Sequence, residues 1–163
     1  MPHLFRRSSA KKPLAARFAF LLFALLLATN GYGQHLFPEK FKGCITDHFT
    51  LEKDTVTAKT DTQALLALVT SALSEAEVKS IRGALLLQIL VDTGGNSCLL
   101  SVENKTNVKT KKLRLKESID SQLRWDKPAK KVAAVVLLQF TNGSVTMKRL
   151  GMDGNMGVQE LRP

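Results

Sequence analysis

Two cysteines, Cys44 and Cys98, are the residues of this sequence best suited to covalent chemistry. In a protein exported from the cytoplasm they are expected to pair, because the compartments outside the cytoplasm are oxidising. The alternative is two buried free thiols, since sequence separation alone does not show that the Cα atoms come within bonding range. We predict a Cys44–Cys98 disulfide, which would tie an N-terminal arm to the remainder of the domain.

Residues that could form a catalytic or metal-binding site are few. His35 and His48 have no cysteine or carboxylate beside them at ligand spacing, which argues against a zinc site. The Gly94-Gly95 pair lacks the lysine and helix of a phosphate-binding loop, and no serine lies in a nucleophile elbow. The carboxylates that could act in pairs are better explained as solvated helix faces: Glu75 with Glu77, and Asp120 with Asp126. We therefore predict a protein that is not an enzyme and has no cofactor or metal; a small hydrolase would need a pocket joining an acid to a histidine.

A basic cluster lies between residues 105 and 116, and it could contact an anionic envelope surface. Its members are Lys105, Lys109, Lys111, Lys112, Arg114 and Lys116. The favoured explanation is a solvated loop and helix start. No aromatic residues alternate with these cations to stack bases, so we expect no nucleic-acid partner.

The N-terminal 33 residues have the pattern of a secretory signal peptide. Five basic residues and no acid precede an apolar run of 11 residues, 18–28, which is short for a membrane span. Gly31 and Gly33 suit a cleavage site after Gly33, and the alternative is an uncleaved anchor helix. Cleavage would leave no membrane span, and 19 basic residues against 14 acidic ones, a net charge of +5.

Hydrophobic periodicity predicts helices and strands along the mature chain. Helices are expected from Asp61 to Leu73, with Thr60 and Gln63 as a capping box, and from Ser74, with Glu77, to Gly83. Gly83 would end this helix directly before a strand, so we expect a positive φ there. A third helix should carry Leu115, Ile119 and Leu123 on one stripe. The expected strands are a short one at 47–51, then 84–92, 97–103, 132–140 and 145–150, with a loop at 104–112 and a mobile tail at 151–163.

Turn residues join these strands into hairpins. Gly94-Gly95 can adopt positive φ, and Asn142-Gly143 is a strong hairpin signal. Cys98, Leu100 and Val102 are expected to share one strand face. Hairpins connected through a helix predict an α+β domain, in which helices pack on one face of a small antiparallel sheet.

Three sequence blocks resemble the C-terminal domain of the TonB family. The first is Ile81-Arg82-Gly83 with the strand to Val91-Asp92 and the Gly94-Gly95 turn. The second is Leu123-Arg124-Trp125-Asp126-Lys127-Pro128, similar to the family's Trp-x-x-Pro, and the third is 138–143. TonB itself has an uncleaved membrane helix and a long proline-rich spacer, whereas this sequence has five prolines and no run of them. The resemblance therefore implies a strand-strand-helix-strand-strand core and a binding mode, but not energy transduction.

The resemblance also implies a partner-binding strand. TonB-type domains bind extended peptides at a sheet edge, and here that strand would be 132–140, or 145–150 if the latter shields that edge. The partner-binding residues would be Val132, Ala134, Val136, Leu138 and Phe140. The residues expected to fix turns and packing are Gly83, Gly94, Gly95, Trp125, Pro128, Asn142 and Gly143. Trp125 could instead be a carbohydrate platform, but a core position is favoured.

These inferences divide the chain into a signal peptide (1–33), an arm with helices (34–82), a TonB C-terminal-like domain (83–150) and a flexible tail (151–163). The predicted location is the periplasm or the exterior of a bacterium with an outer membrane. The partner would be a segment of an outer-membrane or envelope protein. The alternative function is a stand-alone structural or accessory protein that uses the fold as a scaffold.

Overall fold

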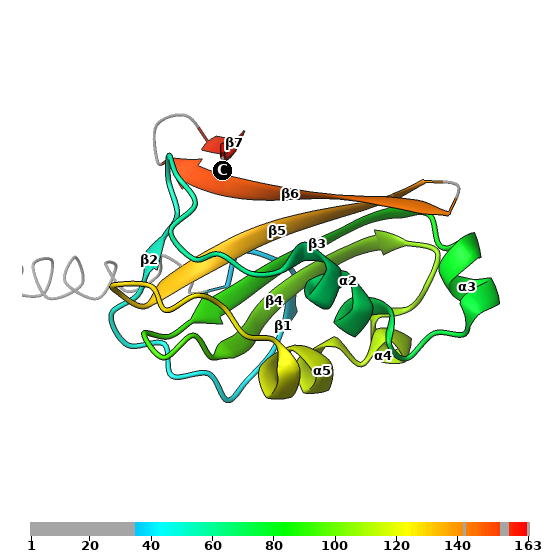
Figure 1. Cartoon of the computed structure of the whole chain (residues 1–163), viewed down its shortest axis with the longest axis horizontal. Coiled ribbons are helices and arrows are strands. Elements are labelled where there is room, and N and C mark those ends of the chain that lie inside the picture. The colour runs from blue at the N-terminus through cyan, green and yellow to red at the C-terminus, as the bar shows by residue number, and fades with distance from the viewer. Residues whose placement is uncertain (1–34, 142, 154–156, 163) are drawn as a thin grey trace, which may run out of the picture. The chain divides into compact units, whose positions relative to one another are not determined.

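The computed structural model describes residues 35–141, 143–153 and 157–162, which belong to one compact unit (Figure 1). The segment assigned to the signal peptide lies outside the described residues, as does Asn142 of the hairpin signal. No helix in the described ranges is long and apolar enough to cross a membrane.

A seven-stranded, mostly antiparallel sheet forms the centre of the unit (Figure 1). Its strands are β1 (Glu39–Lys40), β2 (Thr50–Leu51), β3 (Gly83–Val91), β4 (Ser97–Thr106), β5 (Val132–Thr141), β6 (Ser144–Asp153) and β7 (Gly157–Glu160). They are ordered β1-β4-β3-β5-β6-β7, and β2 pairs in parallel with the start of β5. The strands expected at 84–92 and 132–140 are therefore neighbours at the centre of the sheet.

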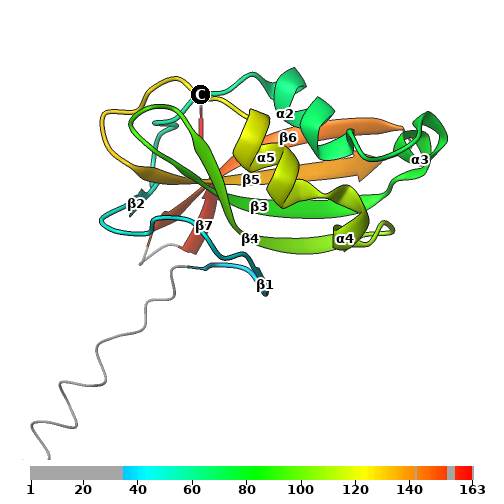
Figure 2. The same cartoon turned by 90° about the horizontal axis from the view of Figure 1, so that it is seen from below.

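The described residues form four helices: α2 (Thr62–Thr70), α3 (Glu75–Ser80), α4 (Thr110–Leu113) and α5 (Leu115–Gln122). Helices α2 and α5 lie over one face of this sheet, α3 and α4 lie toward one end of it, and the N-terminal arm lies across the other face (Figure 2). This arrangement agrees with the expected α+β class and with a mostly antiparallel sheet.

Both faces of the central strands are apolar, because both are covered. Leu85, Leu87 and Ile89 on the helix face of β3 have no exposed surface and belong to the main core. On the other face, Leu90, Leu100 and Ala133 form a second cluster. The arm covers it with Cys44, Phe49 and Leu51. A strand buried on both faces is a nearly continuous apolar run, which explains the composition of residues 85–91.

A β-bulge places Cys98 on the arm side of the sheet, opposite to the face of Val102. The register between β3 and β4 shifts at Gln88/Ile89, where β4 contains one additional residue. A bulge reverses the alternation beyond it, so Val102 remains on the helix face while Cys98 and Leu100 point toward the arm. The prediction that these three residues share one face was wrong, and the bulge is the reason.

The helix ends were predicted in part. The capping box of Ser74 and Glu77 is confirmed, but Asp61 caps α2 in place of Thr60, whose hydroxyl donates to the Arg124 carbonyl. The helix after Ser74 ends at Ser80, and Gly83 begins β3. Gly83 has the positive φ expected of it, 105°, and a Cβ there would lie 2.1 Å from a backbone oxygen of β4.

Two segments that were predicted to lack regular structure contain strands or a helix among their described residues. In place of the loop at 104–112, β4 continues to Thr106 and α4 follows. In the segment predicted to be a tail, β6 extends to Asp153 and β7 pairs back on it. Leu161, which follows β7, is 5% exposed, so its buried side chain packs this part of the chain against the domain.

Candidate functional site

The strand predicted to bind a partner is an interior strand. β5 pairs with β3 over its whole apolar length and with β6 from Val135 onward, while β2 covers its first two residues. The residues proposed for partner contact are at most 4% exposed and belong to the main core: Val132, Ala134, Val136, Leu138 and Phe140. This assignment is corrected, because a strand paired on both sides has no free backbone groups. From the sequence, residues 145–150 are the expected binding strand if that segment shields the edge of 132–140. This condition is met, because β6 pairs with β5.

The outer edge of β6 is open over its first half. β7 pairs only with Leu150–Asp153, and the Leu161 N–H donates to the Arg149 carbonyl (2.9 Å). Alternate residues of a strand direct their backbone groups to the same side, so Val145 and Met147, in phase with Arg149, also point away from β5. In the part of the chain that the structure describes, no hydrogen bond reaches these outward N–H and C=O groups.

An apolar cavity lies beside the start of this free edge. It has a volume of about 270 Å³, and its apolar lining is Leu66 and Ala67 of α2, Val78 of α3, and Phe140 and Val145 of the β5–β6 hairpin. Gly143 and the polar side chains of Gln63, Thr70 and Ser144 complete the lining. Val145 and Met147 are only partly buried where they pack against the main core. The free strand edge and the neighbouring helices thus form one continuous, partly apolar surface.

The opposite edge of the sheet, on β4, is covered from Leu99 to Val102. β1 pairs with Ser101 and Val102, and the Phe41 N–H donates to the Leu100 carbonyl (2.9 Å). Two side chains of α5 complete the cover at Leu99: its N–H donates to Asp120 Oδ1 (2.7 Å), and its carbonyl accepts from Lys116 Nζ (3.3 Å).

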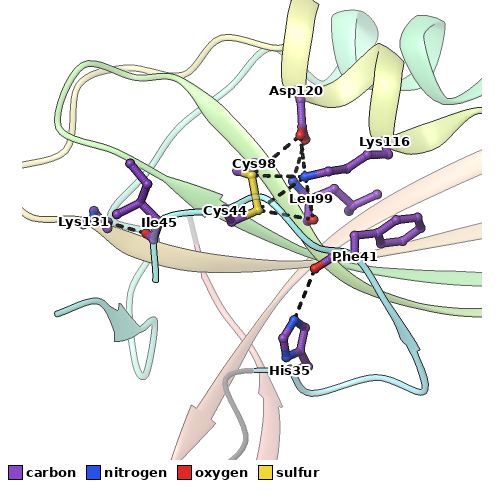
Figure 3. Close-up of a disulfide and its surroundings, with 9 residues drawn as sticks. All are labelled: His35, Phe41, Cys44, Ile45, Cys98, Leu99, Lys116, Asp120 and Lys131. Carbon is purple, nitrogen blue, oxygen red and sulfur yellow. Dashed lines mark hydrogen bonds and ion pairs between the residues drawn. A yellow bond between two sulfur atoms is a disulfide. The ribbon is translucent and has the colours of Figure 1, made fainter. Parts of the chain in front are cut away.

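The predicted disulfide lies beside this covered stretch of β4 (Figure 3). Cys44 and Cys98 are bonded, with 5.7 Å between their Cα atoms, and the described residues include no free cysteine. Lys116 Nζ lies 3.2 Å from Cys98 Sγ and 3.4 Å from Cys44 Sγ. Asp120 pairs with Lys116 at 2.5 Å, and its Oδ2 is 3.6 Å from Cys98 Sγ. One ammonium group therefore contacts both sulfur atoms.

Trp125 is part of the core, as favoured from the sequence. It is 6% exposed, and its Nε1 donates to Ser97 Oγ (2.8 Å). Its backbone N–H donates to the Gly95 carbonyl, and Gly95 has a positive φ of 81° where a Cβ would meet the Trp125 oxygen at 2.3 Å. Gly94 does not share this positive φ; Asp92 instead accepts its N–H. The burial of Trp125 removes the carbohydrate-platform alternative.

A buried ion pair that sequence reasoning missed lies against this tryptophan. Arg149 Nη2 donates to Glu52 Oε2, and its guanidinium carbon is 5.1 Å from the centre of the Trp125 ring. Glu52 also accepts from the backbone N–H groups of Thr57 (2.7 Å) and Ala58 (3.0 Å). Burial lowers the pKa of Arg149, and the charge of Glu52 opposes this shift. No local pattern marks this pair, because its members are 97 positions apart.

Most of the basic cluster is neutralised by neighbouring carboxylates. Lys105 pairs with Glu103, Lys112 with Glu77, Arg114 with Glu117 and Lys116 with Asp120. Only Lys109 and Lys111 have no carboxylate partner within the described ranges. This pairing favours the solvated-surface explanation over an anion-binding site.

Within the described residues, no three His, Cys, Asp or Glu side chains are grouped so that they could hold a metal ion. Neither His35 nor His48 lines one of the three described cavities. No family model, curated protein or solved structure matches the chain.

Proposed function

We propose that this protein is an exported, non-enzymatic module of a bacterial cell envelope, and that it binds an extended segment of another envelope protein by strand addition at β6. The observation that carries the proposal is the unpaired outer edge formed by Val145 and Met147. The signal-like segment of the sequence and the disulfide agree with export. The TonB C-terminal-like sequence blocks support the same binding mode.

Strand addition would use both backbone and side-chain contacts. Val145 and Met147 each offer one N–H donor and one C=O acceptor, which an antiparallel or parallel peptide can pair with. A peptide residue opposite Val145 would direct its side chain toward the helix face, beside the cavity lined by Leu66 and Val78. The backbone contacts would supply affinity, and this cavity would favour an apolar side chain.

The test removes one outward hydrogen-bond donor while it keeps the fold. Met147→Pro deletes an N–H that points away from β5, and proline is tolerated at such edge positions. Thr146→Ala is the matched control, because the Thr146 side chain is exposed and its backbone faces β5. Peptides selected from a random library on the unmodified protein are then titrated against both variants, with NMR detection of the amides of β6.

We expect Met147→Pro to lose peptide binding while Thr146→Ala keeps it. The Val145 and Met147 amides should gain protection from hydrogen exchange when the peptide binds. Selected peptides that leave these amides unprotected, or that bind Met147→Pro unchanged, would refute strand addition at β6.

The second candidate is a structural or accessory scaffold, and the shortness of the open edge favours it. β7 already covers the second half of β6, so only two residues present outward groups. A library that returns no ligand from a folded protein would support this scaffold role.

A further inference from the structure

The environment of the disulfide is not that of an inert crosslink. Lys116 Nζ lies within 3.4 Å of both sulfur atoms, and its side chain is 27% exposed (Figure 3). A cation beside a sulfur stabilises that sulfur as a thiolate, which is the form in which it leaves a broken disulfide. The position of Lys116 therefore favours the products of reduction.

A surface cavity gives access to the bond. It has a volume of about 250 Å³, and both Cys44 and Cys98 line it. Ile45 and Leu90 supply apolar walls, and Lys131, not Lys116, is the lysine of the lining. Lys131 differs from Lys116 because its Nζ bonds to Asp47 and to backbone carbonyls, not to sulfur.

We infer that Cys44–Cys98 is a site of reversible thiol–disulfide exchange, with a thiol reductant as its substrate and Lys116 as the residue that stabilises the departing thiolate. The reductant is a dithiol, either a small molecule or the reduced active site of an oxidoreductase. This inference is independent of the proposed binding at β6.

The exchange takes place in two displacements. A thiolate of the reductant attacks Cys98 Sγ, the Cys44–Cys98 bond breaks, and its electron pair goes to Cys44 Sγ, which leaves as a thiolate beside Lys116. The second thiolate of the reductant then attacks the reductant sulfur that is bonded to Cys98 in the mixed disulfide. That bond breaks, and Cys98 leaves as a thiolate. The reductant is oxidised to its disulfide by two electrons, and the protein gains two thiolates.

Cys44 is the better first leaving group because of Asp120. The carboxylate lies 3.6 Å from Cys98 Sγ and would oppose negative charge there, whereas Cys44 Sγ has the ammonium at 3.4 Å and no carboxylate contact among the described residues. Reduction removes the crosslink between the arm and β4, at the edge that the arm covers.

The experiment measures the rate of reduction of the full mature protein by dithiothreitol, with thiol labelling and mass spectrometry. Lys116→Gln should slow the reduction about five- to ten-fold, since one ionic contact to the thiolate is lost. Lys116→Arg should retain most of the rate because it keeps the charge. Lys131→Gln is the matched control, because it removes a lysine that lines the cavity beside the disulfide but does not touch sulfur.

Salt separates an electrostatic role of Lys116 from a structural one. High salt should slow the unmodified protein toward the rate of Lys116→Gln and have little effect on that variant. Circular dichroism confirms that each variant is folded before the rates are compared. Equal rates for the unmodified protein and Lys116→Gln, or an equal loss in Lys131→Gln, would overturn the inference.

Discussion

Removal of the Cys44–Cys98 bond should destabilise the protein by about 4 kcal/mol. The two cysteines are 54 positions apart, and the chain-entropy relation for a loop of that length gives this value as an upper estimate. It is a large fraction of the net stability of a small domain, roughly 5–15 kcal/mol. For a domain of this size it corresponds to a melting temperature lower by about 15 °C. The perturbation is the double variant Cys44→Ala/Cys98→Ala, compared with the oxidised protein by calorimetry.

The loss of stability should be greatest in the arm. Several backbone N–H groups hold it to the sheet. Among them, Leu36 donates to Gln88 Oε1 (2.8 Å), Phe37 to Ser101 Oγ (3.2 Å) and Phe41 to the Leu100 carbonyl (2.9 Å). Without the crosslink these amides should exchange first, since local openings begin where few buried contacts restrain the chain. Amides of β3 and β5 should exchange only on global unfolding.

Two results would refute this reasoning. A fall in melting temperature of less than about 3 °C would mean that non-covalent contacts hold the arm without the crosslink. Arm amides that exchange no faster than those of β3 would show that the arm and the sheet open as one unit. The reduced unmodified protein serves as the control, because it loses the bond but keeps both sulfur atoms in the packing.

The remaining predictions concern the core and a helix cap. Trp125→Ala should cost about 3–5 kcal/mol in urea denaturation, because it leaves a cavity in the core. Arg149→Ala should cost a similar amount, about 3–5 kcal/mol, by leaving Glu52 buried and unpaired, whereas the double variant Glu52→Leu/Arg149→Met should lose less in the same assay. The pKa of Glu77 is lowered from 4.5 to about 2, and the main cause is a hydrogen bond from Lys112. Its folded-state pKa is the lower one, so the stability that Glu77 contributes is present above pH 4.5 and lost as the pH falls toward 2. Melting curves of Glu77→Gln should therefore lie below those of the unmodified protein at pH 7 and converge with them near pH 2.

The central strands and helices could be predicted because their signals are local. Residues 84–92 and 132–140 are apolar runs bounded by turns, and the capping box of Ser74 and Glu77 spans four residues. The positive φ of Gly83 followed from its position between a helix and a strand. Each of these features depends on interactions within a few positions, which a single sequence contains.

The features that could not be predicted depend on long-range pairing. The bulge at Leu100 reverses the face of Cys98, and nothing near Cys98 in the sequence marks it. The contact of Glu52 with Arg149 joins segments that only the fold brings together. The strand β7 was missed because its glycine-rich surroundings have the composition of a mobile tail, although Leu161 is buried.

The position of β5 shows why a binding edge is harder to predict than a strand. An apolar strand is easily found from its sequence, but burial on both faces is typical of interior strands, and an interior strand has no free edge. The residues most prominent in the sequence of β5 are therefore the least available to a partner. An edge suited to strand addition should instead have mixed side chains and partly buried apolar residues, as Val145, Thr146 and Met147 do.

The outer edges of β4 and β6 are covered over different stretches, and this difference limits where strand addition can occur. On β4, the arm, Lys116 and Asp120 satisfy backbone groups that would otherwise face solvent, and a disulfide fixes the arm in place. Unprotected edges promote aggregation, so covering them is a common property of soluble sheets. On β6, the cover supplied by β7 ends at Leu150 and leaves Val145 and Met147 open. In our proposal, this open stretch of β6 is the surface that receives a strand from another molecule.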